Sequence, residues 1–259
     1  MSMLLADDPR FRPAMQLIDN AEYAEALRQL DALLDRLSPS DSVVALYWKV
    51  ICLTSLGELP QARFWLEHAL TQVDAANPLR ICLELQNAYL LYAEKGPERA
   101  VAEMKGLLDR YAAELKTADF FWVYVQAKTS LGNCLVLAGR YSEAIKELEE
   151  ALSLQDQPLP RYYIYFWLGI ACHRLGDLDK ARGYLEHAIA EARSAPEAGI
   201  PERDAARLRY ELALIAYKQH RYDDAARHLE FTSGVAIQDD PELQRVIKRL
   251  KDFVDQAVS

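Results

Sequence analysis

The chain has 259 residues, of which 51% are hydrophobic and 27% charged, with a formal net charge of −9. This composition is typical of a globular protein with a large core, and no run approaches the roughly 18 apolar residues of a membrane span. The acidic balance argues against a nucleic-acid partner, because phosphate binding needs a basic stripe. The first residues lack the basic start and long apolar stretch of a signal peptide, which predicts a cytoplasmic protein.

An octet of residues occurs twice in the chain and indicates an internal repeat. Residues 62–69 read A-R-F-W-L-E-H-A, and residues 181–188 read A-R-G-Y-L-E-H-A. Turn signals precede each octet, and Gly57, Gly139 and Gly176 lie where a helix should end in the left-handed conformation. The alanine that opens the octet has equivalents along the whole chain, at Ala26, Ala62, Ala100, Ala144, Ala181 and Ala225.

Apolar residues spaced by three and four lie on both sides of each turn, which predicts a helix, a short turn and a second helix in every repeat. Gly132 and Gly169 fall within predicted first helices, where they indicate close approach of two helices. The segment 194–202 contains two prolines and a glycine and is predicted to be a loop. The predicted repeats are 9–37, 41–75, 78–115, 118–156, 159–194 and 202–232.

The last segment, 240–257, is predicted to be an amphipathic helix that Asp240 caps and Pro241 starts. A stack of repeats needs such a helix to cover its last apolar face, so we interpret it as a capping helix. The alternative is a helix that binds a partner or a membrane surface. Its apolar stripe consists of Leu243, Val246, Ile247, Leu250, Phe253 and Val254.

The repeat pattern resembles the tetratricopeptide repeat (TPR). The resemblance implies an all-α fold, a right-handed α-solenoid of about six helix-turn-helix TPR-like repeats in one domain over 1–259, with a C-terminal capping helix. Glu84, Lys128 and Arg209 depart from the signature, because they stand where it has a large apolar residue. The clearest match has Y-x-x-L-G-x-x-C spacing and consists of Tyr165, Leu168, Gly169 and Cys172, followed by Gly176, Ala181, Leu185 and Ala188.

No pattern in the sequence indicates catalysis, and we expect no enzyme activity, cofactor or metal. There is no H-E-x-x-H motif, phosphate-binding loop or nucleophile elbow. His68 and His187 recur because the octet recurs; they belong to different repeats and should lie too far apart for a shared metal site. The cysteines lie in predicted first helices without a C-x-x-C pair and are interpreted as small buried residues, namely Cys52, Cys82, Cys134 and Cys172.

The first helices are rich in large rings, and the resemblance implies that they line a concave groove in which ligands bind. The alternative is that the rings fill the space between neighbouring first helices. Asn133 alone matches the carboxylate clamp by which some TPR grooves bind chaperone tails, and Thr129 stands in the place of its lysine. The predicted partner-binding groove consists of Tyr47, Ile51, Leu85, Tyr89, Tyr92, Asn133, Phe166, Ile170, His173, Arg207, Tyr210, Leu214 and Tyr217.

These observations predict a protein–protein interaction scaffold or adaptor that binds a peptide or partner segment in an aromatic-rich groove. One alternative is a sensor or regulatory domain whose groove binds a small molecule or a signalling peptide. Another is a self-associating structural protein, in which the aromatic surface is buried between copies and the chain forms a homo-oligomer.

Overall fold

A computed structural model describes residues 8–74, 77, 79–117, 120–154, 161–194, 202–232 and 240–258, and the regular structure of these residues is helical throughout. This confirms the predicted all-α repeat fold. The chain divides into two compact units, Met1–Ala138 and Gly139–Ser259. The single domain over 1–259 stays a prediction. The predicted loop at 194–202 separates two helices, and its residues 195–201 lie outside the described ranges.

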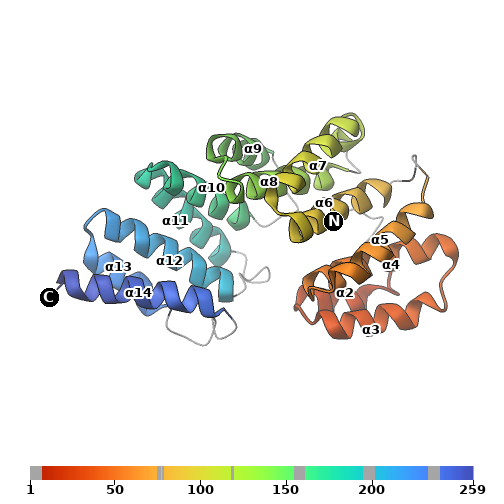
Figure 1. Cartoon of the computed structure of the whole chain (residues 1–259), viewed down its shortest axis with the longest axis horizontal. Helices are drawn as coiled ribbons and strands as arrows, with labels where there is room; N and C mark the ends of the chain where they lie inside the picture. The colour runs from red at the N-terminus through yellow and green to blue at the C-terminus, as the bar shows by residue number, and fades with distance from the viewer. Residues whose placement is uncertain are drawn as a thin grey trace. The chain divides into compact units, whose positions relative to one another are not determined.

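The first unit consists of consecutive helices, each packed on the next along the chain (Figure 1). A single turn of 3-10 helix, Glu114–Lys116, precedes the last helix and buries Leu115. The α-helices are α2 (Arg12–Asp19), α3 (Tyr23–Leu34), α4 (Pro39–Ser55), α5 (Leu59–Thr71), α6 (Leu79–Lys95), α7 (Pro97–Arg110) and α8 (Phe121–Leu137).

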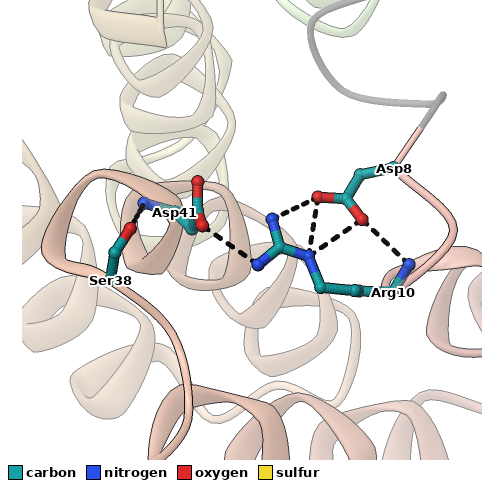
Figure 2. Close-up of polar contacts among 4 residues, drawn as sticks. All are labelled: Asp8, Arg10, Ser38 and Asp41. Carbon is teal, nitrogen blue, oxygen red and sulfur yellow. Dashed lines mark hydrogen bonds and ion pairs between the residues drawn. The ribbon is translucent and has the colours of Figure 1, made fainter.

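A cluster of polar contacts fixes the start of this unit (Figure 2). The Arg10 guanidinium donates to both carboxylate oxygens of Asp8 and, through Nη1, to Asp41 Oδ2 at 3.0 Å. Asp41 lies in the first turn of α4, where the Ser38 side chain caps the helix by accepting from the Asp41 N–H at 3.3 Å. These contacts attach the segment before α2 to the beginning of α4.

The second unit contains a further series of packed helices (Figure 1). They are α9 (Tyr141–Ser153), α10 (Arg161–Leu175), α11 (Leu178–Ser194), α12 (Glu202–Lys218), α13 (Tyr222–Glu230) and α14 (Pro241–Val258). Within the described residues no helix is long and apolar enough to cross a lipid bilayer.

Five of the turns that precede a second helix have a residue with positive φ at the same place, whereas the turn before α7 has Gly96 one residue later. Gly57, Gly139 and Gly176 have φ of 78°, 75° and 86°, which confirms the left-handed conformation predicted for them. Each of these glycines lies five residues before the alanine that opens the octet or its equivalent. In the first and last helix pairs Ala21 and His220 occupy this position, with φ of 60° and 59°. A side chain in this conformation costs roughly 1–2 kcal/mol. The regularity of the turns therefore extends to repeats that lack the glycine.

The helices α10 and α11 approach closely at Gly169, as the sequence predicts. A Cβ atom at this position would lie 2.5 Å from Leu185 Cγ and 3.3 Å from the Ala181 carbonyl oxygen. Leu185 and Ala181 are completely buried, so a larger side chain at 169 would need this contact to separate. Gly132 is buried in α8, and its role in close helix packing stays a prediction.

The last helix, α14, buries its apolar stripe against α12 and α13, as a capping helix must. Asp240 Oδ1 accepts from the Leu243 N–H at 3.0 Å and so caps the helix as predicted. Val246 packs against the same cluster, whereas Phe253 at the edge of the stripe is 42% exposed. The cluster consists of Ala206, Ala213, Ala216, Ala225, Leu229, Leu243, Ile247, Leu250 and Val254.

Candidate functional site

In the first unit, the predicted groove residues lie on neighbouring first helices α4 and α6. Tyr47 of α4 and Leu85 of α6 are buried, with 4% and 1% of their surfaces exposed. Ile51 and Tyr89 are half-buried, and Tyr92 is 40% exposed. Exposure therefore rises along α6 toward its carboxyl end, where Tyr92 presents a ring to solvent.

Polar contacts join these first helices side by side. The side chain of Gln86 in α6 donates to the Tyr47 hydroxyl at 3.5 Å, and the hydroxyls of Tyr89 and Ser130 share a short hydrogen bond between α6 and α8. Burial raises the pKa of Tyr47 far above its usual range, so its hydroxyl stays protonated. Asn133 lies half-buried one turn further along α8. Hydrogen bonds thus join α4 to α6 and α6 to α8. The predicted groove residues of α4 and α6 are called the stripe below, namely Tyr47, Ile51, Leu85, Tyr89 and Tyr92.

In the second unit, the predicted residues of α10 are buried and those of α12 are half-buried. Phe166 and Ile170 have 7% and 9% of their surfaces exposed, and the Phe166 ring packs edge-on against Trp167. On α12, the half-buried side chains are those of Arg207, Tyr210, Leu214 and Tyr217. The predicted residues of α10 therefore contribute mainly to packing.

A buried histidine joins α10 to α12. His173 is 2% exposed; its Nδ1 lies 2.9 Å from Glu211 Oε2, and its Nε2 lies 2.8 Å from Lys218 Nζ. An ammonium group has only hydrogens to offer, so Nε2 accepts from Lys218 and the Nδ1–H donates to Glu211. This arrangement selects one neutral tautomer of the imidazole. Both ring nitrogens are thereby used within the protein, and His173 acts as a link between helices.

The predicted groove residues on α12 are partly covered by α14. Tyr210, Leu214 and Tyr217 pack against the apolar cluster that α14 completes, and the rings of Tyr217 and Phe253 lie 6.4 Å apart. Arg207 reaches Asp240 at the start of α14, with an Nη2–Oδ2 distance of 3.4 Å. The predicted groove residues thus meet within each unit, but they differ in accessibility, and their role in partner binding stays a prediction.

A buried ion-pair network surrounds Glu84 and was not predicted from the sequence. This carboxylate is 7% exposed and accepts from Arg80 Nε at 3.1 Å, from the Tyr111 hydroxyl at 2.9 Å and from Arg110. It joins α6 to the end of α7 and the residue that follows. The sequence contained one signal for this network, since Glu84 stands where the repeat signature has a large apolar residue. A charge buried at such a position requires ionic or hydrogen-bonding partners.

A second missed contact involves Lys49, whose side chain is 9% exposed. Its ammonium lies 4.0 Å from the centre of the Trp65 ring and forms an ion pair with Asp31. Three consecutive helices, α3, α4 and α5, are joined by this contact. Such an ammonium is stabilised by the face of the indole as well as by the carboxylate.

The recurrent histidines lie on second helices, His68 on α5 and His187 on α11, as the repeat register predicts. His68 bonds to Gln72, and His187 packs edge-on against Tyr165. Among the described residues no group of histidine, cysteine and acidic side chains is placed to hold a metal ion. The cysteines are free and buried, and burial raises the pKa of Cys52 and Cys134 to about 11 and that of Cys82 to about 12.

Several solved structures share this fold. Pseudomonas aeruginosa PilF has a TM-score of 0.58 and 20% identity, covering 83% of this chain and 90% of PilF. BtubC from P. vanneervenii has a TM-score of 0.62 and 15% identity, over 96% of this chain and 93% of that chain. A chain of the APC/C hetero-tetramer Cut9–Hcn1 has a TM-score of 0.72 and 15% identity, covering 93% of this chain and 42% of that chain.

A comparison with curated proteins finds no match. The profile described as tetratricopeptide repeat matches residues 14–78 and 129–198, which together make up just over half of the chain. These segments contain both octets and the turns that precede them. With the helix-turn-helix pairs and left-handed turns described above, this match shows that the chain belongs to the tetratricopeptide repeat family.

Proposed function

We propose that this protein is an interaction scaffold that binds a segment of a partner protein along the first helices of its repeats, without catalysis. The observation that carries the proposal is the partly exposed stripe on α4 and α6, in which Tyr92 is 40% exposed beside the half-buried Tyr89. Tyrosine suits such a surface, because it offers a large apolar ring with a polar tip. Tyr47 and Leu85 on the same two helices are buried and anchor the stripe in the core.

A position-specific cross-link tests this proposal. A photo-reactive benzoylphenylalanine replaces Tyr92 in one variant and Phe64 in a matched control. Phe64 is 61% exposed but lies on the second helix α5. We expect the label at 92, and not the label at 64, to capture a defined partner, identified by mass spectrometry from the source cells. Equal capture at both positions would contradict binding along the first helices.

A loss-of-binding variant complements the cross-link. Tyr92→Ala removes an exposed ring and should weaken binding of the captured partner without changing helicity, because little core packing is lost. Phe166→Ala is unsuitable for this purpose, since emptying a buried aromatic site costs about 3–5 kcal/mol. Unchanged affinity of Tyr92→Ala for the captured partner would contradict the proposed role of the ring. Circular dichroism provides the control for folding.

Self-association is a second candidate, supported by exposed rings that do not belong to the stripe. Phe64 on α5, Phe231 after α13 and Phe253 on α14 are 61%, 69% and 42% exposed. Aromatic side chains are enriched in the surfaces through which proteins associate. Sedimentation velocity over a range of concentrations separates the two candidates, because a monomeric mass at the highest concentration rejects self-association.

A further inference from the structure

A cluster of arginines on α12 and α13 lines a cavity that the stripe of first helices does not include. The cavity has a volume of about 330 Å³ and is lined by Arg209, Arg221, Asp224, Arg227, His228 and Phe231. The helices α12 and α13 pack directly on one another, with α11 against α12 (Figure 1). Since the chain as a whole carries a net charge of −9, this local accumulation of guanidinium groups runs against its overall charge.

The charges of this cavity are unbalanced. Asp224 is shared between Arg221 and Arg227, and these contacts lower the pKa of the carboxyl and keep it ionised. Arg209 contacts the Phe231 ring at 4.1 Å from its centre and has no carboxylate partner among the described residues. Burial lowers the pKa of Arg209, and Arg193 nearby acts in the same direction. A guanidinium retains its charge even so.

Other titratable groups in or beside the cavity are His228, Asp223 and Glu186. Burial lowers the pKa of His228, so its imidazole is neutral at physiological pH. Asp223 belongs to an adjoining cavity of about 400 Å³ that shares Arg221 and Arg227, and Glu186 is close enough to act on His228. Among the described residues that line the cavity, Arg221 and Arg227 therefore share the one carboxylate of Asp224, and the fork of Arg209 has none.

An apolar cavity adjoins the charged one at Arg209. It has a volume of about 160 Å³ and is lined by Ile189, Ala192, Arg193, Ala205, Leu208 and Arg209. Most of this lining is aliphatic, and Phe231 at the other side of Arg209 is 69% exposed. The two cavities together offer an aliphatic recess and a cationic recess next to each other, with Arg209 between them.

We propose that this cleft, formed by α11, α12 and α13, binds an acidic segment of a partner protein in which carboxylate side chains alternate with an apolar one. The carboxylates form paired hydrogen bonds with Arg209 and Arg227, and the apolar side chain enters the recess beside Leu208. Arginine is suited to this task, because its rigid fork matches the geometry of a carboxylate. Charge complementarity selects the peptide, and the aliphatic recess favours it over a polyphosphate ligand.

The binding test uses a defined probe, a fluorescein-labelled peptide of sequence Glu-Leu-Glu-Glu-Leu-Glu, and the full chain. We expect fluorescence anisotropy to show saturable binding that weakens as salt is raised, and about tenfold weaker binding of the same peptide with glutamine in place of glutamate. Equal affinity for the two peptides, or no binding of the acidic peptide below about 1 mM, would overturn the proposal.

Variants locate the site. Arg209→Gln and Arg227→Gln should each weaken binding of the acidic peptide about tenfold, since each loses a charge-assisted pair. The control is Arg245→Gln on α14, which makes the same charge change at a side chain that is 76% exposed. Arg227 is 73% exposed in its side chain, so its variant keeps the test valid if Arg209→Gln destabilises the fold. Equal effects of all three variants would overturn the assignment.

Two further measurements separate this cleft from other ligands and from the stripe on the first helices. A ten-residue oligothymidylate or a phosphoserine version of the peptide that binds more tightly than the acidic peptide would assign the cleft to phosphate and overturn the proposal. Tyr92→Ala should leave binding of the acidic peptide unchanged. The proposals for the stripe and for the cleft can therefore fail independently.

Discussion

Two glycines on neighbouring helices should respond to the same substitution in opposite directions. Gly169→Ala adds a methyl group that would lie 2.5 Å from Leu185 Cγ and 2.6 Å from its Cδ2. Apolar carbons are normally about 3.5–4.0 Å apart, so Leu185 or α11 must move by roughly 1 Å. Gly183→Ala, on α11, has no atom within 4 Å of the added methyl group.

The expected magnitudes follow from two competing effects. Alanine favours the helix over glycine by about 1 kcal/mol at either position. At 169 this gain is offset by overpacking, which typically costs about 1–3 kcal/mol when the neighbour is held in a core, and Leu185 is completely buried. We expect Gly169→Ala to destabilise the protein by about 1 kcal/mol and Gly183→Ala to stabilise it by a similar amount.

Thermal unfolding followed by circular dichroism measures both changes. Each kcal/mol should shift the midpoint by about 2–4 °C in a protein of this size, so the two variants should differ by about 4–8 °C. Gly106→Ala on α7, where the nearest atom is Arg110 Nη2 at 3.9 Å, is a further control. A stabilising Gly169→Ala would refute the close packing of α10 on α11 that we infer from the repeat.

Other parts of the chain give independent expectations. Asp240→Ala removes the side-chain cap of α14 and should lower stability by about 1 kcal/mol in a denaturant titration. Because the folded-state pKa of His228 is lowered by burial, the unfolded chain binds more protons as pH falls below 6.5; stability should fall there, and less steeply in His228→Gln, as melting curves can show. A thiol reagent at pH 8 should react only after unfolding with the buried cysteines Cys52, Cys82, Cys134 and Cys172, since burial raises the pKa of each.

The fold was predictable because its determinants are local in sequence. Gly57 and Gly176 mark turns whose conformation only a few residue types adopt easily. The alanines that recur at the first position of the octet are buried where a larger side chain would separate the helices. The same spacing located the close approach at Gly169. Such features recur at fixed distances along the chain, so a single sequence is enough to recognise them.

Accessibility of the candidate site was not predictable in the same way. Periodicity places Phe166 and Tyr92 on corresponding stripes, but one is 7% and the other 40% exposed. The difference depends on how far the side chains of neighbouring helices cover each ring, which is set by packing between segments distant in sequence. The network around Glu84 likewise requires Arg110 at the end of α7 and Tyr111 after it, and helical periodicity carries no such information.

The left-handed turns imply that local opening is not uniform along the chain. Ala21 and His220 adopt without glycine a conformation that disfavours a side chain, and they belong to the first and last helix pairs. In a repeat protein, the total stability is approximately the sum of the stability of each repeat and of the contacts between adjacent repeats. The first pair therefore combines a strained turn with a neighbouring repeat on one side only, whereas α14 covers the last pair. Amide protons in α2 should exchange with solvent sooner than those in α5.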